Sequence, residues 1–199
     1  MLSSHQQNTP LLRALPLLLV LALLGACSTI NTSIPAQVEN KDKAAVDHLL
    51  VLMDQRLAVA PEVAKSKWNS GAAIDDPARE KQILDDIGQR AAQQGVDRAL
   101  ALAFFQSQFD AGKIVQNDLH AHWRQQQLAP FSQVPDLAHD IRPVLDKLTP
   151  ELITSLKSVQ SHLCDANVQN LLAADSVTLL RSDWNQATRE QALAPLHCH

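Results

Sequence analysis

Apolar residues recur along most of this chain at the three- and four-residue spacing of an α-helix. In one segment the repeat includes two cations: Leu49, Met53, Arg56, Ala60, Val63 and Lys67. In a second segment it includes a glycine and an amide: Leu102, Phe105, Phe109, Gly112, Gln116, Leu119 and Trp123. Residues at this spacing share one face of a helix. The pattern therefore predicts two long helical regions that direct Arg56, Lys67 and Gln116 toward the interior.

Capping residues and helix breakers divide the chain into about six helices. The first is expected from Lys41 to about Asn69, with Pro61 either kinking it or opening a second segment. Asp75 or Asp76 ahead of a proline is a typical start for the second helix. The second to sixth helices are expected at about 77–94, 98–127, 136–162, 165–174 and 176–194. Because glycines and β-branched runs are few, we predict an all-α fold with a single helical domain.

Residues 1–26 have the pattern of a signal peptide. Arg13 precedes the apolar run LPLLLVLALLGA, which is short for a membrane-spanning helix. The end of this run, from Leu24 to Cys27, also resembles a bacterial lipobox, in which the cysteine becomes the lipid-bearing first residue of the mature chain. We favour lipidation of Cys27, and ordinary cleavage after Ala26 is the alternative.

The residues after the leader divide into a polar tether and a folded domain. Segment 27–40 has the composition of a tether, and 41–199 is expected to form the helical domain. With 199 residues and 46% apolar content, the chain is long enough for one real core. Export would permit Cys164 and Cys198 to form a disulfide, which would close a loop of about 34 residues and stabilise the fold by roughly 3–4 kcal/mol. Two reduced, unconnected thiols are the alternative.

Charge and histidine placement weigh against two classes of function. The formal net charge is −4 and no Lys/Arg-rich run is present, so we expect no nucleic-acid partner. The eight histidines form local clusters only at His120 with His122 and at the C-terminal His197-Cys198-His199. A pair two residues apart on a helix points to different faces. We therefore expect no metal site.

Inward-facing cations and amides need partners. Burying such a group costs several kcal/mol unless it is paired, so the interior holds either the chain's own carboxylates or an anionic ligand. The alternative is that the Arg and Lys stems lie along apolar surface with their charged heads in water.

The polar positions, taken together, resemble a known family. Arg56, Lys67 followed by Trp68, the run IDDPARE, and the run FFQSQFDAGKIVQ that ends in Gln116 are similar to the all-helical type II chorismate mutases. The resemblance is closest to their exported, gamma-type branch and spans about 46–198. It implies an isomerase that rearranges chorismate to prephenate without a cofactor.

The resemblance implies catalytic roles for three residues. Arg56 would bind one substrate carboxylate through bidentate guanidinium geometry. Lys67 and Gln116 would donate hydrogen bonds to the ether oxygen from opposite sides. Some relatives use Glu where this chain has Gln116, and a Glu must be protonated before it can donate. We therefore expect activity that is nearly flat from about pH 5 to 8.

The remaining substrate contacts are also implied by the resemblance. Arg79 would contact the enolpyruvyl carboxylate region, and the backbone of Asp76 or the side chain of Glu80 would hold the ring hydroxyl. A later helix would supply Arg142, whose alternative is a surface pair with the aspartate four residues on. Gly112 departs from the Ser, Thr or Asn common in the family, so one polar contact is expected to be absent or replaced.

The resemblance also bears on location and assembly. Exported relatives carry a similarly placed C-terminal disulfide, which implies the Cys164–Cys198 pairing. We expect an exported, periplasmic protein, attached to a membrane only through a lipid anchor, that forms a homodimer. Two alternatives remain from other classes. One is an exported helical lipoprotein that binds a small dicarboxylate without catalysis, and the other is a structural envelope protein.

Overall fold

A computed structural model describes residues 33–198 of the chain. The expected leader, the expected lipidation site Cys27 and the first part of the expected tether lie outside this range. Within it, no helix is both long and apolar enough to cross a membrane.

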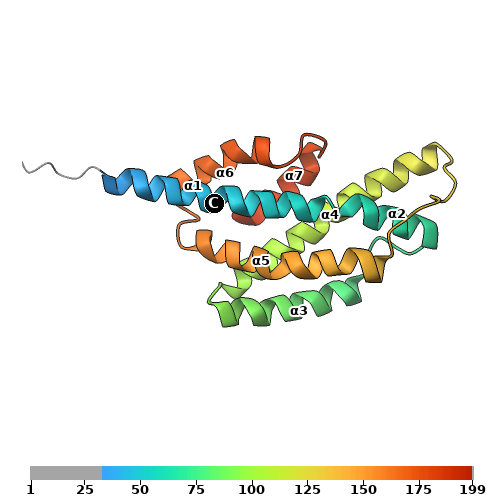
Figure 1. Ribbon diagram of the computed structural model, residues 1–199, viewed down its shortest axis with the longest axis horizontal. Helices are drawn as coiled ribbons and strands as arrows, with labels where there is room; N and C mark the ends of the chain where they lie inside the picture. Colours follow the sequence, from blue (N-terminus) through green and yellow to red (C-terminus); the bar gives the residue numbers. More distant parts are fainter. Residues whose placement is uncertain (1–32, 199) are drawn as a thin grey trace, which may run out of the picture. The chain divides into compact units, whose positions relative to one another are not determined.

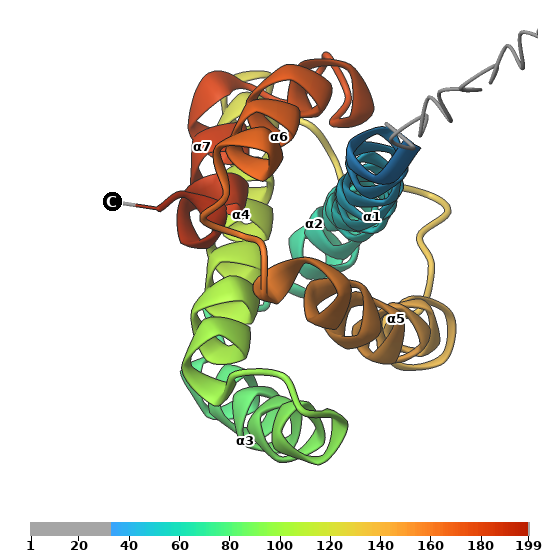
Figure 2. The same ribbon diagram turned by 90° about the vertical axis from the view of Figure 1, so that its left-hand side faces the viewer.

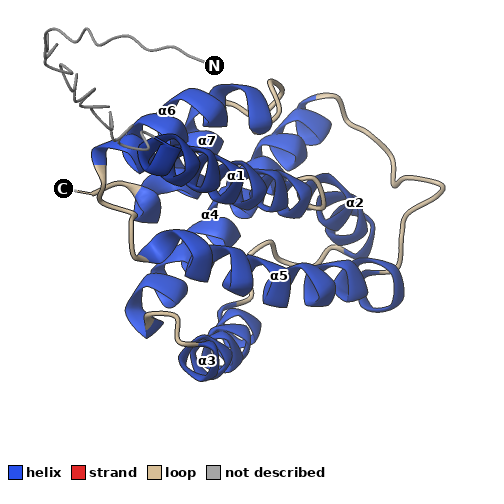
Figure 3. Ribbon diagram, turned by 60° about the vertical axis from the view of Figure 1, so that its left-hand side comes forward, coloured by secondary structure: helices blue, strands red, loops and turns tan. Residues whose placement is uncertain are grey.

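All regular elements of the described residues are helices, as Figure 3 shows. The predicted all-α fold class is therefore confirmed. The elements are α1 Ser33–Leu57, α2 Ala60–Ser70, α3 Pro77–Gln94, α4 Arg98–Gln125, the π-helical turn η1 Leu137–Ile141, α5 Arg142–Gln160, α6 Ala166–Leu179, α7 Gln186–Leu193 and the 3₁₀ turn η2 Ala194–Leu196.

The first predicted helix is two helices. Pro61 lies in the first turn of α2, where its missing N–H breaks no hydrogen bond. If α1 and α2 formed one continuous helix, Pro61 would lie in its interior and would remove a backbone hydrogen bond. Of the two alternatives that the sequence left open, the structure thus has Pro61 opening a second segment. In Figure 1, α2 continues along the line of α1.

Three helix boundaries differ from the sequence-based prediction. Helix α1 begins at Ser33, ahead of Lys41. The helix expected from Asp136 instead starts with the π-helical turn η1, capped by the Asp136 carboxylate, and passes into α5 at Arg142. The last break falls after Leu180 and before Asn185, because Leu180 adopts an extended conformation and Asn185 caps α7. Local composition does not determine where such breaks fall.

Helices α1 and α4 organise the packing. Helix α1 packs against α5 and α6, whereas α4 packs against α2, α3 and α7. Figure 2 shows α5 and α6 on two sides of α1. The largest fully buried side chains come from α1, α3, α4, α5 and α6 and from Leu180: Leu49, Leu50, Met53, Leu57, Ile87, Phe104, Phe105, Leu152, Ile153, Leu156, Leu172 and Leu180. This core fixes the relative positions of the helices that bear the predicted site residues.

Candidate active site

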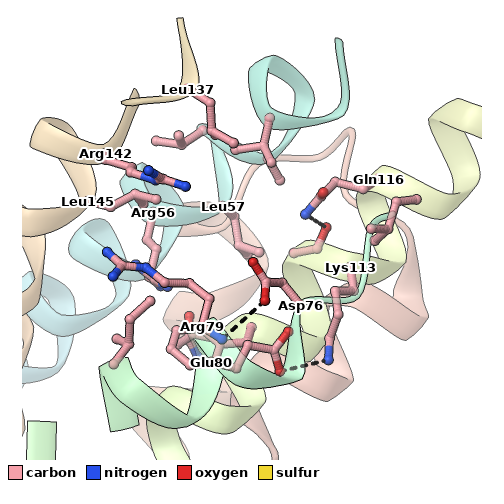
Figure 4. A pocket seen from close by; sticks show the side chains of 18 of the residues that line it. Arg56, Leu57, Asp76, Arg79, Glu80, Lys113, Gln116, Leu137, Arg142 and Leu145 are labelled. Atoms are coloured by element: carbon pink, nitrogen blue, oxygen red, sulfur yellow. Dashed lines mark hydrogen bonds and ion pairs between the residues drawn. The ribbon is translucent and has the colours of Figure 1, made fainter. Parts of the chain in front are cut away.

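One cavity of about 200 Å³ gathers the predicted site residues. Its walls come from α1, α2, the turn before α3, α3, α4, η1 and α5. All eight predicted substrate-contacting residues line it: Arg56, Lys67, Asp76, Arg79, Glu80, Gly112, Gln116 and Arg142. Figure 4 shows Arg56 and Arg142 on one side of this cavity and Lys113 and Gln116 on the other. The structure therefore brings all eight predicted residues to one cavity.

Arg56 lies in the last turn of α1, where the helix dipole favours a cation. Its guanidinium lies over the Phe109 ring, 5.1 Å from the centroid. The Nε atom is buried and finds no hydrogen-bond partner among the described residues. Burial lowers the pKa of Arg56 to about 10. Arg56 thus carries an unmet donor at the cavity wall.

Lys67 occupies the last turn of α2 and is half-buried. Its Nζ donates to the carbonyl oxygen of Ile74 at 2.6 Å. Burial lowers the pKa of Lys67, and the nearby carboxylates of Asp76 and Glu80 oppose that shift. Among the described residues, Lys67 forms no ion pair shorter than 4 Å. The other ammonium protons therefore remain available to a ligand.

The acidic turn before α3 supplies a cap and a carboxylate. Asp76 accepts a hydrogen bond from the backbone N–H of Arg79 at 3.1 Å, which makes Asp76 and not Asp75 the cap. Glu80 lies one turn into α3 and is partly buried. Arg79 is largely exposed at the rim of the cavity. Asp76 and Glu80 line the same cavity as Gln116.

Gln116 is 7% exposed on α4, which confirms that it points inward. Its Nε2 donates to the carbonyl oxygen of Gly112 at 3.1 Å, and its Oε1 has no partner among the described residues. A Cβ added at Gly112 would meet nothing closer than 3.9 Å. The cavity therefore keeps free space beside the amide, where a larger residue would have placed a side chain.

Arg142 reaches the cavity from the first turn of α5. It is exposed, and no ion pair with Asp146 occurs within the part of the chain that the structure describes. The expected alternative, a surface ion pair with Asp146, is thus not formed. Leu137 of η1 lies beside Arg142 and covers one edge of the cavity (Figure 4).

The sequence-based prediction missed a cation at the cavity. Lys113 lines it and pairs with Asp110 at 2.9 Å, Glu80 at 3.2 Å and Asp75 at 3.6 Å. Burial alone would lower the pKa of Lys113, but the hydrogen bonds to Asp110 and Glu80 outweigh it and raise the pKa. The available signal was helical spacing, since Lys113 lies three residues before Gln116 and three after Asp110.

Two further predictions concern cysteines and histidines. Cys164 and Cys198 form a disulfide with a Cα–Cα distance of 5.5 Å, which confirms the predicted pairing. His120 is buried, with its Nε2 2.8 Å from the carbonyl oxygen of Ala64, while His122 is exposed. Within residues 33–198, no group of three potential ligands is arranged to hold a metal ion.

The site can stabilise anions by position and charge. Arg56, Lys67 and Arg142 supply positive charge, and Gln116 supplies a neutral amide from the facing helix. Donors fixed in a partly buried site need little reorganisation when negative charge develops on a ligand. This arrangement suits a reaction that requires a held conformation and electrostatic stabilisation.

Known proteins with similar sequences and structures identify the family. The chorismate mutase type II family matches residues 44–117. A secreted chorismate mutase of Mycolicibacterium smegmatis is 34% identical over 102 residues, which are 51% of this chain and 56% of that protein. A chorismate mutase of Methanocaldococcus jannaschii is 31% identical over 81 residues, which are 41% of this chain and 82% of that protein.

The fold agrees with these sequence matches. A crystal structure of chorismate mutase from Burkholderia thailandensis has a TM-score of 0.71 and 38% sequence identity, and the match covers 77% of this chain and 99% of that one. The chain spans only 56% of the length of the Mycolicibacterium protein, but it covers most of the Methanocaldococcus and Burkholderia proteins. This chain therefore belongs to the type II chorismate mutase family.

Proposed function

We propose that this chain is a cofactor-free chorismate mutase that rearranges chorismate to prephenate in the cavity between α1, α2, α3, α4 and α5. The observation that carries the proposal is the convergence of Arg56, Lys67, Gln116 and Arg142 on one cavity within a single chain. Chorismate carries two carboxylates and an ether oxygen on which negative charge grows. Its rearrangement is intramolecular and needs no nucleophile or proton transfer, so fixed donors and a fixed conformer suffice.

The donors on opposite walls of the cavity each contact a particular group of the substrate. Arg56 binds one carboxylate with its unpaired Nε and the rest of its guanidinium. Lys67 donates to the ether oxygen from α2, and Gln116 donates to it from α4. Because Gln116 already bonds the Gly112 carbonyl, its second amide N–H serves the substrate.

The remaining contacts hold the substrate in its compact form. Arg142 and Arg79 lie where the cavity opens and bind the second carboxylate. Glu80 accepts a hydrogen bond from the ring hydroxyl. The Asp76 carboxylate already caps α3, so Asp76 contacts the same hydroxyl through its backbone. A Cβ at Gly112 would meet nothing closer than 3.9 Å, so the polar contact that the family commonly makes from this position has no side-chain donor or acceptor here.

The test is the loss of ultraviolet absorbance of chorismate over time. The chain is purified after expression under oxidising conditions, beside Gln116→Ala and the control Gln125→Ala, which truncates an exposed glutamine on the same helix. We expect Gln116→Ala to lower kcat about 10²- to 10³-fold, or roughly 3–4 kcal/mol of barrier, and Gln125→Ala to leave it unchanged. A folded, disulfide-bonded chain without turnover would favour the dicarboxylate-binding module instead.

Export is supported by relatives that are named secreted chorismate mutases. We further propose that the chain is periplasmic, that residues 1–26 are removed and that Cys27 carries a lipid anchor. Mass spectrometry of the mature protein tests this. An N-terminal diacylglyceryl group on Cys27 is expected, and an unmodified N-terminus would overturn lipidation while leaving export in place.

We also propose a homodimer with a complete site in each chain. The second half of this proposal is supported by the eight predicted substrate-contacting residues, which come together at one cavity from within a single chain. Light scattering of the mature protein gives the oligomeric state. A monomer that retains full activity would overturn the dimer and agree with a site contained in one chain.

A further inference from the structure

The turn before α3 raises an electrostatic difficulty for a site that binds a dianion. This turn carries Asp75 and Asp76, and the first turn of α3 carries Glu80. Asp76 and Glu80 line the cavity, whereas Asp75 is largely exposed and lies 3.6 Å from Lys113. One carboxylate oxygen of Asp76 accepts a hydrogen bond from the backbone N–H of Arg79. The other two carboxylates have no comparable backbone bond among the described residues. Left uncompensated, they would repel an anionic ligand.

Lys113 meets both of these carboxylates from the facing helix. Its Nζ lies 3.2 Å from Glu80 and 3.6 Å from Asp75, and it also contacts Asp110 on its own helix at 2.9 Å. The side chains of Lys113 and Glu80 are each 21% exposed, so solvent screens this pair only in part. The bridge joins the start of α3 to the middle of α4 at one edge of the cavity (Figure 4).

The bridge also explains why Lys67 pairs with no carboxylate within the described part of the chain. Asp75, Asp76 and Glu80 all lie close enough to Lys67 to raise its pKa against the effect of burial. Nevertheless Lys67 donates to the Ile74 carbonyl and to none of these carboxylates. A carboxylate held by Lys113 cannot turn toward Lys67 and occupy its donors.

We propose that Lys113 is a positioning residue that holds Glu80 and Asp75 away from Lys67, so that an acidic turn can line a site for a dianionic substrate. The inference rests on the proposed function. Lys113 does not act on the reacting atoms itself. It sets the direction of the Glu80 carboxylate and cancels charge that would otherwise face the substrate.

The experiment compares Lys113→Met, Lys113→Arg and the double variant Lys113→Met/Glu80→Gln. Lys113→Met should raise KM so that kcat/KM falls about tenfold to thirtyfold, because the released carboxylate repels the substrate and pairs with Lys67. Lys113→Arg, which keeps the ion pairs, should remain within about threefold of the original chain. The double variant should be about fivefold faster than Lys113→Met, because it removes the freed charge.

Lys81→Met is the matched control. It removes the same charge from an exposed ion pair with Asp85 on α3, away from the cavity, and should change neither KM nor kcat. If Lys113 were only a structural clamp, or bound substrate directly, adding Glu80→Gln would bring no recovery. A double variant no faster than Lys113→Met would therefore overturn the inference, as would a Lys113→Met chain with unchanged KM.

A binding measurement separates this inference from the proposed reaction. Calorimetric titration of chorismate into Gln116→Ala, with and without Lys113→Met, reports affinity in a background where turnover is about 10²- to 10³-fold slower. We expect about tenfold weaker binding with Lys113→Met and partial recovery when Glu80→Gln is added. An original chain that binds but does not convert chorismate would overturn the proposed reaction. Equal affinities with and without Lys113→Met would overturn the role of Lys113.

Discussion

Asp54 and Arg56 lie close together near the end of α1, yet their surroundings are opposite in kind. Asp54 accepts hydrogen bonds from the backbone N–H and Nε of Arg181, both at 3.0 Å, and from Nε1 of Trp184 at 2.8 Å. Arg56 has a buried Nε with no partner among the described residues and a guanidinium stacked over Phe109. The Asp54 carboxylate is hydrogen-bonded within the fold, whereas the Arg56 guanidinium keeps a donor that a ligand can use.

Gln169 and Gln116 differ in the same way. Gln169 of α6 bonds the carbonyl oxygens of Leu163 and Leu196 at 2.7 and 2.8 Å, near the disulfide. Gln116 of α4 leaves its Oε1 buried and unpaired within the described part of the chain. A buried polar atom without a partner costs free energy. Within residues 33–198, Ser155 and Thr188 also leave a buried hydroxyl unpaired away from the cavity, so an unpaired atom indicates a ligand-binding group only where it lines the cavity.

Replacing a cavity cation should give the largest effect, and it should fall on activity alone. We expect Lys67→Met to lower kcat/KM by at least about 10²-fold, because an ether-oxygen donor is lost. The free energy of unfolding should stay within about 1 kcal/mol, since the lost bond to Ile74 is offset by removal of a desolvated charge. Chorismate turnover and urea unfolding measure the two effects. Lys65→Met, which breaks a pair with Glu62 on the same helix, is the control and should retain activity.

Replacing Asp54 should lower stability and leave activity nearly unchanged. Asp54→Ala leaves the donors of Arg181 and Trp184 without their shared acceptor, so we expect the free energy of unfolding to fall by about 2–3 kcal/mol. Activity at low temperature should stay within about threefold. Urea unfolding is the measurement, with Asp47→Ala as a control at an exposed pair with Lys43 that should cost less than about 1 kcal/mol. A large loss of kcat in folded Asp54→Ala would contradict the proposed division.

A smaller change is expected at Gly112, where the fold and the site meet. Gly112→Ala adds a methyl group that meets Ala60 Cβ at 3.9 Å and Gln116 Nε2 at 4.0 Å, which is ordinary contact. Helix propensity should then raise the free energy of unfolding by about 0.5–1 kcal/mol. Gly88→Ala is the contrasting variant, because its Cβ would lie 2.9 Å from Nε of Arg98. Thermal unfolding should show a gain at position 112 and a smaller gain or a loss at position 88.

The smallest effect is the expected constancy of activity between about pH 5 and 8. The Gln116 amide donates at any pH in this range, and the pKa of Arg56, about 10, lies above it. A steep loss between pH 6 and 8 would argue against Gln116 as the ether-oxygen donor. On the alkaline side kcat/KM should fall, since burial lowers the pKa of Lys67 below 10.5 and that of Arg56 to about 10.

Stability should move the opposite way at alkaline pH. Each depressed pKa means that the folded chain loses its proton before the unfolded chain does. Between the two values the unfolded state binds more protons, so the contribution of Lys67 and Arg56 to the free energy of unfolding rises with pH. Activity and stability profiles measured together between pH 8 and about 10.5 therefore distinguish loss of cations in the cavity from general unfolding.

Local sequence signals determined most of the helices. Asp97 caps α4 and accepts from the N–H of Leu100 at 2.7 Å, and Gly95 ends α3 with a positive φ of 74°. The repeat of apolar residues also gave the inward direction of Gln116. These signals act within one or two turns of helix, so they can be recognised without the rest of the fold.

The tertiary structure alone decided how distant polar groups pair. Lys113 meets Glu80 across two helices, Arg142 comes to the cavity from a segment far along the chain, and Asp54 holds the loop that ends at Asn185. Helical spacing indicates which face of its own helix a residue occupies, but it does not indicate which other helix packs against that face. That choice follows from the joint packing of the helices around one core, and it brings Lys113 to the carboxylates of Asp75 and Glu80.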